Sequence, residues 1–279
     1  MTQTRRYSEL DVFTATPLLG NPLAVVHDGR GLSDAQMAAF ARWTNLSETT
    51  FLLPPAHAEA DYKVRIFTPQ RELPFAGHPT LGSCHAWLGA GGKPRDASEV
   101  IQECAVGLVR VRRDGARLAF AAPPLKRSGP LDADLLARIV RALGLQSDEV
   151  VDHQWVDNGP GWCAVRLPSA ARALELAPDY AQLRGLSLGV VAPHPAGADV
   201  QFEVRALIGH GTGYEDPVTG SLNASLAQWL IGAGVAPPQY VAAQGAALKR
   251  AGRVHVQRVG ADTWIGGDVC EVVAGTVAL

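Results

Sequence analysis

The stretch Pro79-Thr80-Leu81-Gly82-Ser83-Cys84-His85-Ala86-Trp87-Leu88 contains no Lys, Arg, Asp or Glu. Proline is favoured at the first position of a helix and glycine commonly ends one, so the sequence predicts a helix from Pro79 to the residue before Gly89. A helix without a charged face is normally enclosed on all sides by other parts of the protein. This stretch therefore predicts a buried, central helix.

The rest of the chain supplies strands to surround such a helix, and it does so twice. In the first half, residues 7–13, 23–26, 47–53 and 62–68 are typical of strands, and 35–43 of an amphipathic helix capped by Ser33-Asp34. In the second half, 161–167 and 200–207 predict strands, 131–143 an amphipathic helix, and 220–231 a second uncharged helix. We therefore expect an α+β fold of two pseudo-symmetric halves, each a barrel-like sheet around a central helix. A doubly wound sheet fits less well, because strands and helices do not alternate regularly.

The boundary between the halves is predicted in the segment from Pro123-Pro124 to Gly129-Pro130, which is rich in turn residues. We expect an N-terminal domain over 1–124 and a C-terminal domain over 125–279, with the last strand able to return to the first domain. The two uncharged helices also begin alike, with Pro79–Ser83 in one and Val218–Ser221 in the other.

Composition favours a soluble globular protein, since 47% of the 279 residues are hydrophobic, 19% are charged and the net charge is −2. No basic stripe predicts a nucleic-acid partner. The uncharged run from Pro217 to Leu248 is interrupted by polar residues, glycines and prolines, so we do not expect it to span a membrane. The N-terminus lacks the apolar run of a secretory signal, and the four cysteines form no C-x-x-C motif, which favours a cytoplasmic protein with reduced thiols.

Two acidic segments carry the candidate chemistry: Asn45-Leu46-Ser47-Glu48-Thr49 and Glu215-Asp216-Pro217-Val218-Thr219-Gly220-Ser221. Between them lies Gly77-His78, at the start of the first uncharged helix. Carboxylates, an imidazole and two helix N-termini suit the movement of a proton on a small anionic substrate. We expect both helix N-termini to face one cleft and to bind a substrate carboxylate there.

Each candidate residue also has a simpler interpretation. Glu48 could be an exposed glutamate at a strand end, although it shares a strand face with Thr50 and so could point into an enclosed space. His78 could only cap a helix, Asp216 could only cap or close a turn, and Ser221 could be an ordinary serine at a helix start. No spacing of His, Cys, Asp or Glu resembles a zinc site, so we predict no metal.

In their order along the chain, these segments resemble the phenazine biosynthesis PhzF-like family, which is related to diaminopimelate epimerase. The resemblance covers nearly the whole chain and rests on these motifs: Gly20-Asn21-Pro22, Asn45–Thr49, Phe67-Thr68-Pro69, Glu72–Gly82, Glu215–Ser221, Gln244-Gly245 and Gly266-Gly267. The resemblance implies the two-half fold, usually as a homodimer. It also implies a cofactor-independent isomerase of phenazine-biosynthesis type.

The resemblance further implies roles for individual residues. Glu48 would shuttle the proton, and His78 and Asp216 would be the other catalytic residues. Four residues would contact the substrate: Ser47, Gly77, Gly220 and Ser221. The cysteine pair used by diaminopimelate epimerase has no counterpart beside either helix, so two-thiol racemisation is not expected.

Three functions remain open at the level of sequence. The first is an isomerase with Glu48 as a single base, and the second is an epimerase that uses Glu48 and Asp216 from opposite faces of the substrate. The third is a small-metabolite binding protein that has lost catalysis on the same fold. Two departures from the family pattern, at Ala206–Ile208 and at Leu222, suggest that the substrate could differ from the phenazine precursor.

Overall fold

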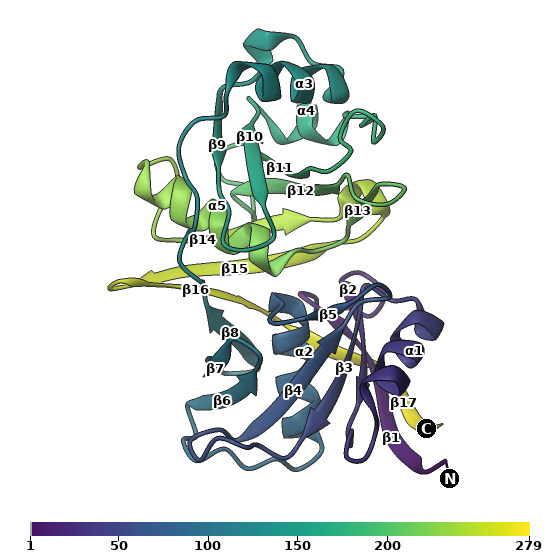
Figure 1. The fold of residues 1–279 in the computed structure, drawn as a ribbon. Coiled ribbons are helices and arrows are strands. Elements are labelled where there is room, and N and C mark those ends of the chain that lie inside the picture. Colours follow the sequence, from purple (N-terminus) through teal and green to yellow (C-terminus); the bar gives the residue numbers. More distant parts are fainter. Residues whose placement is uncertain (1) are drawn as a thin grey trace. The chain divides into compact units, whose positions relative to one another are not determined.

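The computed structural model describes residues 2–279, which divide into two units (Figure 1). Unit 1 is the chain up to Ala121 together with Gly266–Leu279, and unit 2 is Ala122–Ile265. The C-terminal segment thus belongs to the first unit, where its strand pairs with the first strand of the chain.

Unit 1 contains two helices and most of the strands of the first half. In chain order its elements are β1 (Thr4–Val12), β2 (Asn21–Val26), α1 (Asp34–Thr44), β3 (Glu48–Leu53), β4 (Tyr62–Phe67), β5 (Glu72–Leu73), α2 (Gly77–Gly89), β6 (Glu99–Cys104), β7 (Gly107–Asp114), β8 (Arg117–Ala121) and β17 (Val269–Ala278). Helix α1 begins with a capping box between Ser33 and Gln36 and ends at Asn45, which adopts the left-handed conformation that closes helices. The helix predicted over 35–43 is therefore confirmed.

The sheet of unit 1 follows the order β17-β1-β2-β3-β4-β6-β7-β8. Strands β2 and β3 are parallel, as are β4 and β6, and the other pairs are antiparallel. Helix α2 contacts β1 to β4, β6 to β8 and β17, so the sheet wraps around it. The predicted central helix is confirmed in this unit.

The start of α2 differs from the prediction. The helix begins at Gly77, with Ala76 as the N-cap, so Pro79 is its third residue and not its first. A proline is tolerated there because the first N–H groups of a helix have no partner within the helix. The internal similarity between Pro79–Ser83 and Val218–Ser221 is consequently out of register, since the two central helices begin at Gly77 and Gly220.

Unit 2 is built on a second sheet and a second central helix. In chain order its elements are α3 (Ala133–Leu143), the short 3₁₀ turn η1 (Ser147–Glu149), β9 (Asp152–Trp155), β10 (Trp162–Arg166), α4 (Ala170–Leu174), β11 (Ser187–Pro193), β12 (Phe202–Ile208), β13 (Tyr214–Asp216), α5 (Gly220–Gly232), β14 (Gln239–Gln244), η2 (Ala246–Leu248), β15 (Gly252–Val259) and β16 (Asp262–Gly267), whose last two residues belong to unit 1. The sheet runs β9-β10-β11-β12-β14-β15, with β13 paired to β12.

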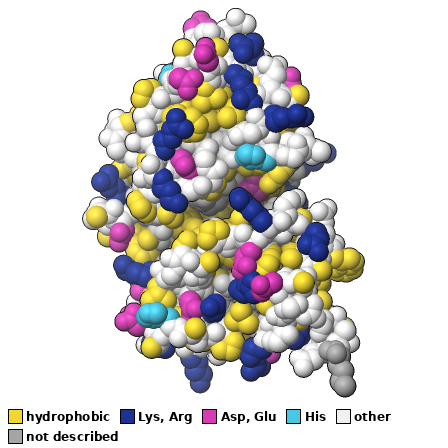
Figure 2. Space-filling view, viewed as in Figure 1, with side chains coloured by type: hydrophobic (Ala, Val, Ile, Leu, Met, Phe, Trp, Pro, Cys, Tyr) yellow, Lys and Arg dark blue, Asp and Glu magenta, His cyan; other side chains and the backbone are white. Residues whose placement is uncertain are grey.

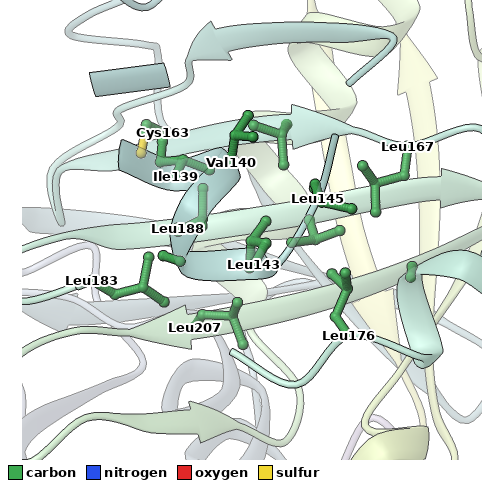
Figure 3. Packing of buried hydrophobic residues seen from close by; sticks show 14 of the residues in the cluster. Ile139, Val140, Leu143, Leu145, Cys163, Leu167, Leu176, Leu183, Leu188 and Leu207 are labelled. Atoms are coloured by element: carbon green, nitrogen blue, oxygen red, sulfur yellow. The ribbon is translucent and has the colours of Figure 1, made fainter. Parts of the chain in front are cut away.

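Helices α3 and α5 both bury apolar side chains in unit 2. Ile139 and Leu143 of α3 pack with Leu188 and Leu207 of the sheet (Figure 3). Helix α5 has nine buried residues out of thirteen, as expected for a helix without charged residues. Leu222 of α5 is fully buried, and a Cβ at Gly189 of β11 would lie 2.6 Å from its Cδ1 atom. Leu222 is therefore a core residue, and the glycine opposite makes room for it.

The two units share one topology. In each unit the second and third strands are parallel (β2 with β3, β10 with β11), the third and fourth are antiparallel (β3 with β4, β11 with β12), and the fourth is parallel to the sixth (β4 with β6, β12 with β14). The central helices α2 and α5 both follow the fifth strand. The pseudo-symmetric halves predicted from the sequence are confirmed as repeats of one arrangement.

The surface and the helices agree with the composition. On the face shown in Figure 2, Lys and Arg side chains lie among Asp, Glu and uncharged side chains, and they form no continuous basic stripe there. Among residues 2–279 no helix combines the length and the apolar character needed to cross a membrane.

Candidate active site

Glu48 is the first residue of β3, and its side chain is 15% exposed. It follows the left-handed Asn45 that ends α1, so the chain turns directly from this helix into the strand. Thr50 lies on the same face of β3, is fully buried, and accepts a hydrogen bond of 3.0 Å from the Ser83 hydroxyl of α2. This face of β3 therefore points toward the central helix, and the interpretation of Glu48 as an exposed strand-end residue is wrong.

His78 is the second residue of α2 and lies beside Glu48, with 3.3 Å between its Nε2 and the Glu48 Oε2. Burial lowers the pKa of His78 to about 3, and a hydrogen bond with the Pro22 backbone opposes this only in part. The imidazole is therefore neutral near pH 7. Its contact with Glu48 is a polar contact with a neutral ring and not an ion pair.

Asn21, the first residue of β2, holds the other side of the His78 ring. Its Nδ2 lies 3.4 Å from His78 Nδ1. The preceding Gly20 donates its N–H to the buried Asp11 carboxylate at 2.9 Å, and a Cβ at Gly20 would lie 2.2 Å from the Val12 carbonyl oxygen. Only glycine fits at this position, so the close approach of the chain to β1 fixes where Asn21 stands.

The predicted substrate-binding residues of unit 1 flank this pair. Ser47 is half-buried and precedes Glu48, and Gly77 is the buried first residue of α2. The N-cap of α2 is Ala76, which makes no side-chain cap hydrogen bond, so His78 is not the capping residue. Unit 1 thus brings together Glu48, His78, Ser47 and Gly77 at one end of the central helix.

Asp216 of unit 2 is the last residue of β13, three residues before the N-cap of α5. The Thr219 hydroxyl donates a hydrogen bond to Asp216 Oδ2. The neighbouring Glu215 forms a two-pronged ion pair with Arg205 of β12, at 3.0 and 2.7 Å, and both side chains are only 5% exposed. Because this pair joins β12 to β13, it anchors the strand that carries Asp216.

The start of α5 holds Gly220 and Ser221, its first and second residues. The Trp162 indole N–H donates to Ser221 Oγ at 3.1 Å, and Asn158 Nδ2 donates to the Ser221 carbonyl oxygen at 3.0 Å. An indole N–H can only donate, so the Ser221 hydroxyl hydrogen points elsewhere. Ser221 is therefore set up as a hydrogen-bond donor at the helix start.

The topological repeat relates these two helix starts. His78 and Ser221 are each the second residue of a central helix. His78 contacts Asn21, the first residue of β2. Ser221 contacts Asn158, which comes shortly before β10, the second strand of unit 2. Neither asparagine was predicted as a site residue from the sequence, and Trp162 was not predicted either. Asn21 stood in the quoted Gly20-Asn21-Pro22 motif, but no local pattern links it to a residue 57 positions away.

Among residues 2–279 no group of three His, Cys, Asp or Glu side chains is arranged to hold a metal ion. The carboxylates, imidazole, hydroxyl and helix N–H groups described above can take part in proton exchange and hydrogen bonding.

Comparison with known proteins extends these observations. The model of a family described as phenazine biosynthesis-like protein matches residues 10–268, which is most of the chain. The chain belongs to this family.

Relatives in the phenazine biosynthesis-like family include named enzymes. The chain is 36% identical over 225 residues to trans-2,3-dihydro-3-hydroxyanthranilate isomerase of Pseudomonas chlororaphis, a match that covers 79% of this chain and 78% of the relative. It is 37% identical over 228 residues to a Schizosaccharomyces pombe protein named antisense-enhancing sequence 1, with 77% and 76% covered. Other relatives are named uncharacterized isomerases. Several relatives are thus named isomerases, and this chain is an isomerase of the family.

Solved structures of the family have the same fold. A phenazine biosynthesis protein of the PhzF family from Enterococcus faecalis aligns with a TM-score of 0.83 at 23% identity, and the alignment covers 99% of this chain and 100% of that one. The fold predicted from the sequence is therefore confirmed.

One of the four cysteines lies inside the central helix of unit 1. Cys84, inside α2, is fully buried, and burial raises the pKa of its thiol to about 12. Such a thiol stays protonated and unreactive at neutral pH. Its role is packing in the core around α2.

Proposed function

We propose that this protein is a cofactor-independent isomerase that moves a proton on a small carboxylate-bearing substrate, with Glu48 as the single base. The observation that carries the proposal is the position of Glu48, largely buried and 3.3 Å from a neutral His78. A carboxylate in such a place is desolvated on one side and held by a polar neighbour, which suits repeated uptake and release of a proton.

His78 supports this role because it is neutral. A neutral imidazole can orient the Glu48 carboxyl group without neutralising it by a permanent ion pair. Asn21 and the Pro22 backbone restrain the ring, so the orientation persists while Glu48 gains and loses its proton. We assign His78 to orienting Glu48 and the substrate.

The residues at the start of α5 in unit 2 are proposed to supply further substrate-binding groups. Ser221, Gly220 and the first N–H groups of α5 would hold a carboxylate, because helix N-termini favour anions and the Ser221 hydroxyl is directed as a donor. In the same way, Ser47 and Gly77 would contact the substrate at the start of α2. Asp216 would bind a hydrogen-bond-donating group such as an amine or a hydroxyl.

The relative from Pseudomonas chlororaphis suggests the first substrate to try, trans-2,3-dihydro-3-hydroxyanthranilate. We expect the purified protein to convert it or a related small carboxylate, and Glu48→Gln to lower kcat by about 10²- to 10⁴-fold, the usual contribution of a general acid–base group. Glu48→Asp keeps a carboxylate and should keep part of the activity. If a folded Glu48→Gln variant retains full kcat, Glu48 is not the base.

An epimerase is the second candidate, because Asp216 supplies another carboxylate in unit 2. In a two-base epimerisation, solvent deuterium enters only the inverted product, whereas a one-base shift can return the substrate proton to another carbon. A ligand that raises the melting temperature but is recovered without deuterium would instead indicate a binding protein.

We also propose that the protein is a homodimer, as the family resemblance implies. Sedimentation velocity tests this proposal: a mass near twice 29.5 kDa is expected, and a single species near 29.5 kDa would refute it.

A further inference from the structure

The Gln244 side chain lies at the end of β14, is 1% exposed, and makes four hydrogen bonds around the start of α5. Its Oε1 accepts from the Thr219 backbone N–H at 3.0 Å and from Asn223 Nδ2 at 2.8 Å. Its Nε2 donates to the Asp216 carbonyl oxygen at 3.2 Å and to Thr219 Oγ1 at 3.0 Å. Every hydrogen-bonding position of this buried amide is therefore used.

The direction of each hydrogen bond in this group follows from one fixed donor. A backbone N–H can only donate, so the Gln244 atom next to the Thr219 N–H must be the amide oxygen. The other end of the amide is then the NH₂ group, and it must donate to Thr219 Oγ1. Since a hydroxyl carries one hydrogen, the hydrogen of Thr219 is left to point at Asp216 Oδ2.

The Thr219 hydroxyl makes this hydrogen bond to Asp216 in place of the usual helix-capping hydrogen bond. A threonine at the N-cap usually accepts a hydrogen bond from an N–H of the first helical turn and so stabilises the helix. Thr219 is the N-cap of α5 but makes no such bond. Its counterpart in unit 1, Ala76, has no hydroxyl at all. The Thr219 hydroxyl therefore serves Asp216 and not the helix.

We propose that Thr219 and Gln244 are positioning residues that hold the Asp216 carboxylate with Oδ2 fixed as a hydrogen-bond acceptor. The chain Gln244 Nε2 to Thr219 Oγ1 to Asp216 Oδ2 keeps Asp216 an oriented anion. This inference rests on the proposed function in one respect only, namely that Asp216 binds a substrate. It predicts that the substrate group bound by Asp216 is a hydrogen-bond donor, because an anion presented in this way would repel a carboxylate.

The test measures the Asp216 carboxyl group directly and needs no substrate. The protein is labelled with ¹³C at the aspartate carboxyl carbons, Asp216→Asn identifies the resonance, and the pKa of Asp216 is read from its titration by NMR. Loss of a hydrogen bond to an ionised carboxylate should raise this pKa by about one pH unit in Thr219→Val. Thr219→Ser keeps the hydroxyl and should leave the pKa within about 0.3 pH unit of the wild-type value.

Gln244→Leu provides a second variant should Thr219→Val fail to fold. It removes the donor that directs the Thr219 hydroxyl, and we expect the pKa of Asp216 to rise in this variant as well. An unchanged pKa in a folded Thr219→Val or Gln244→Leu protein would overturn the proposal, as would an equal rise in Thr219→Ser. Failure of the wild-type protein to isomerise any substrate would refute the proposed function and leave this titration unaffected.

Discussion

At the scale of single residues, His78 is buried, with a side chain 6% exposed, and it contacts the carboxyl group of Glu48. The cost of burying a charge determines the protonation state of His78, because the imidazole stays neutral although the Glu48 carboxyl group lies beside it. A second histidine, the half-buried His27, has its pKa lowered to about 4, mainly by desolvation and in part by the charge of Arg6. Both residues make the folded protein sensitive to acid.

His78 gives a prediction about stability and pH. Its pKa is about 3 in the folded protein, against 6.5 for an ordinary histidine. Above pH 6.5 both folded and unfolded chains carry a neutral ring, and below it only the unfolded chain takes up the proton. The free energy of unfolding should therefore fall by about 1.4 kcal/mol for each pH unit between pH 6 and pH 4 because of His78 alone.

Urea unfolding of the wild type and of His78→Gln at pH 7, 6, 5 and 4.5 checks this prediction. The variant should lose stability less steeply as the pH falls, so the two curves converge toward acid. His27→Gln should show the same effect over a narrower range, since its folded pKa is higher. Parallel curves for wild type and His78→Gln would show that the imidazole is not buried in its neutral form.

At the scale of elements, the repeat supplies an internal control for the buried ion pair. Arg205 of β12 holds Glu215 of β13 through two hydrogen bonds, and Arg65 of β4 holds Glu72 of β5 in the same way, at 2.8 and 2.7 Å. The first pair is 5% exposed on both sides, while the side chains of Arg65 and Glu72 are 22% and 37% exposed. The same geometry thus occurs in two different environments.

We predict that Glu215→Gln lowers the free energy of unfolding by about 3 kcal/mol, because it leaves the Arg205 charge buried and without its counter-ion. Glu72→Gln should cost less than about 1 kcal/mol, since solvent screens the more exposed pair. Chemical denaturation of both variants measures the difference. Equal losses in the two variants would mean that burial does not set the strength of these pairs.

A second element-scale prediction concerns the close fit of α2 in its sheet. A Cβ at Gly82 would lie 2.4 Å from Leu23 Cδ2 and 3.1 Å from Val12 Cγ2, whereas no such atom lies within 4 Å of a Cβ at Gly89. Gly82→Ala should therefore destabilise the protein by about 1–3 kcal/mol, although alanine favours helices. Gly89→Ala, in the same helix, should be neutral or slightly stabilising. Thermal or urea unfolding of both variants tests this, and a stabilised Gly82→Ala protein would contradict the packing of α2 against β1 and β2.

At the scale of the whole molecule, the features that sequence reasoning predicted are those set by local patterns. The absence of charge in residues 79–88 and 220–231 was enough to predict both central helices, and periodicity predicted α1 and the strands β3 and β4. The start of a helix was predicted less accurately than its presence, since α2 begins two residues before Pro79, which was predicted as its first residue.

Contacts between distant segments could not be predicted in this way. The hydrogen-bonded residues Asn21 and His78 are 57 positions apart in the sequence. Trp162 and Ser221 are 59 positions apart, and Gln244 and Thr219 are 25 positions apart. The short strands β5 and β13 were not predicted, because two or three residues are too few to show a period. Longer strands such as β7, β11 and β15 were not predicted either. The sequence named Glu48, His78 and Asp216 as candidates through motifs, but the neighbours that orient them depend on the folded arrangement of the strands.

The measurement that most directly tests the central claim is isomerisation of trans-2,3-dihydro-3-hydroxyanthranilate in deuterated buffer, followed by NMR, with wild type and Glu48→Gln compared. We expect the wild-type product to carry deuterium at the newly protonated carbon whenever the proton on Glu48 exchanges with solvent. We also expect a folded Glu48→Gln protein to form product about 10²- to 10⁴-fold more slowly than the wild type. Turnover by Glu48→Gln at the wild-type rate, with the same deuterium incorporation, would contradict the assignment of Glu48 as the base.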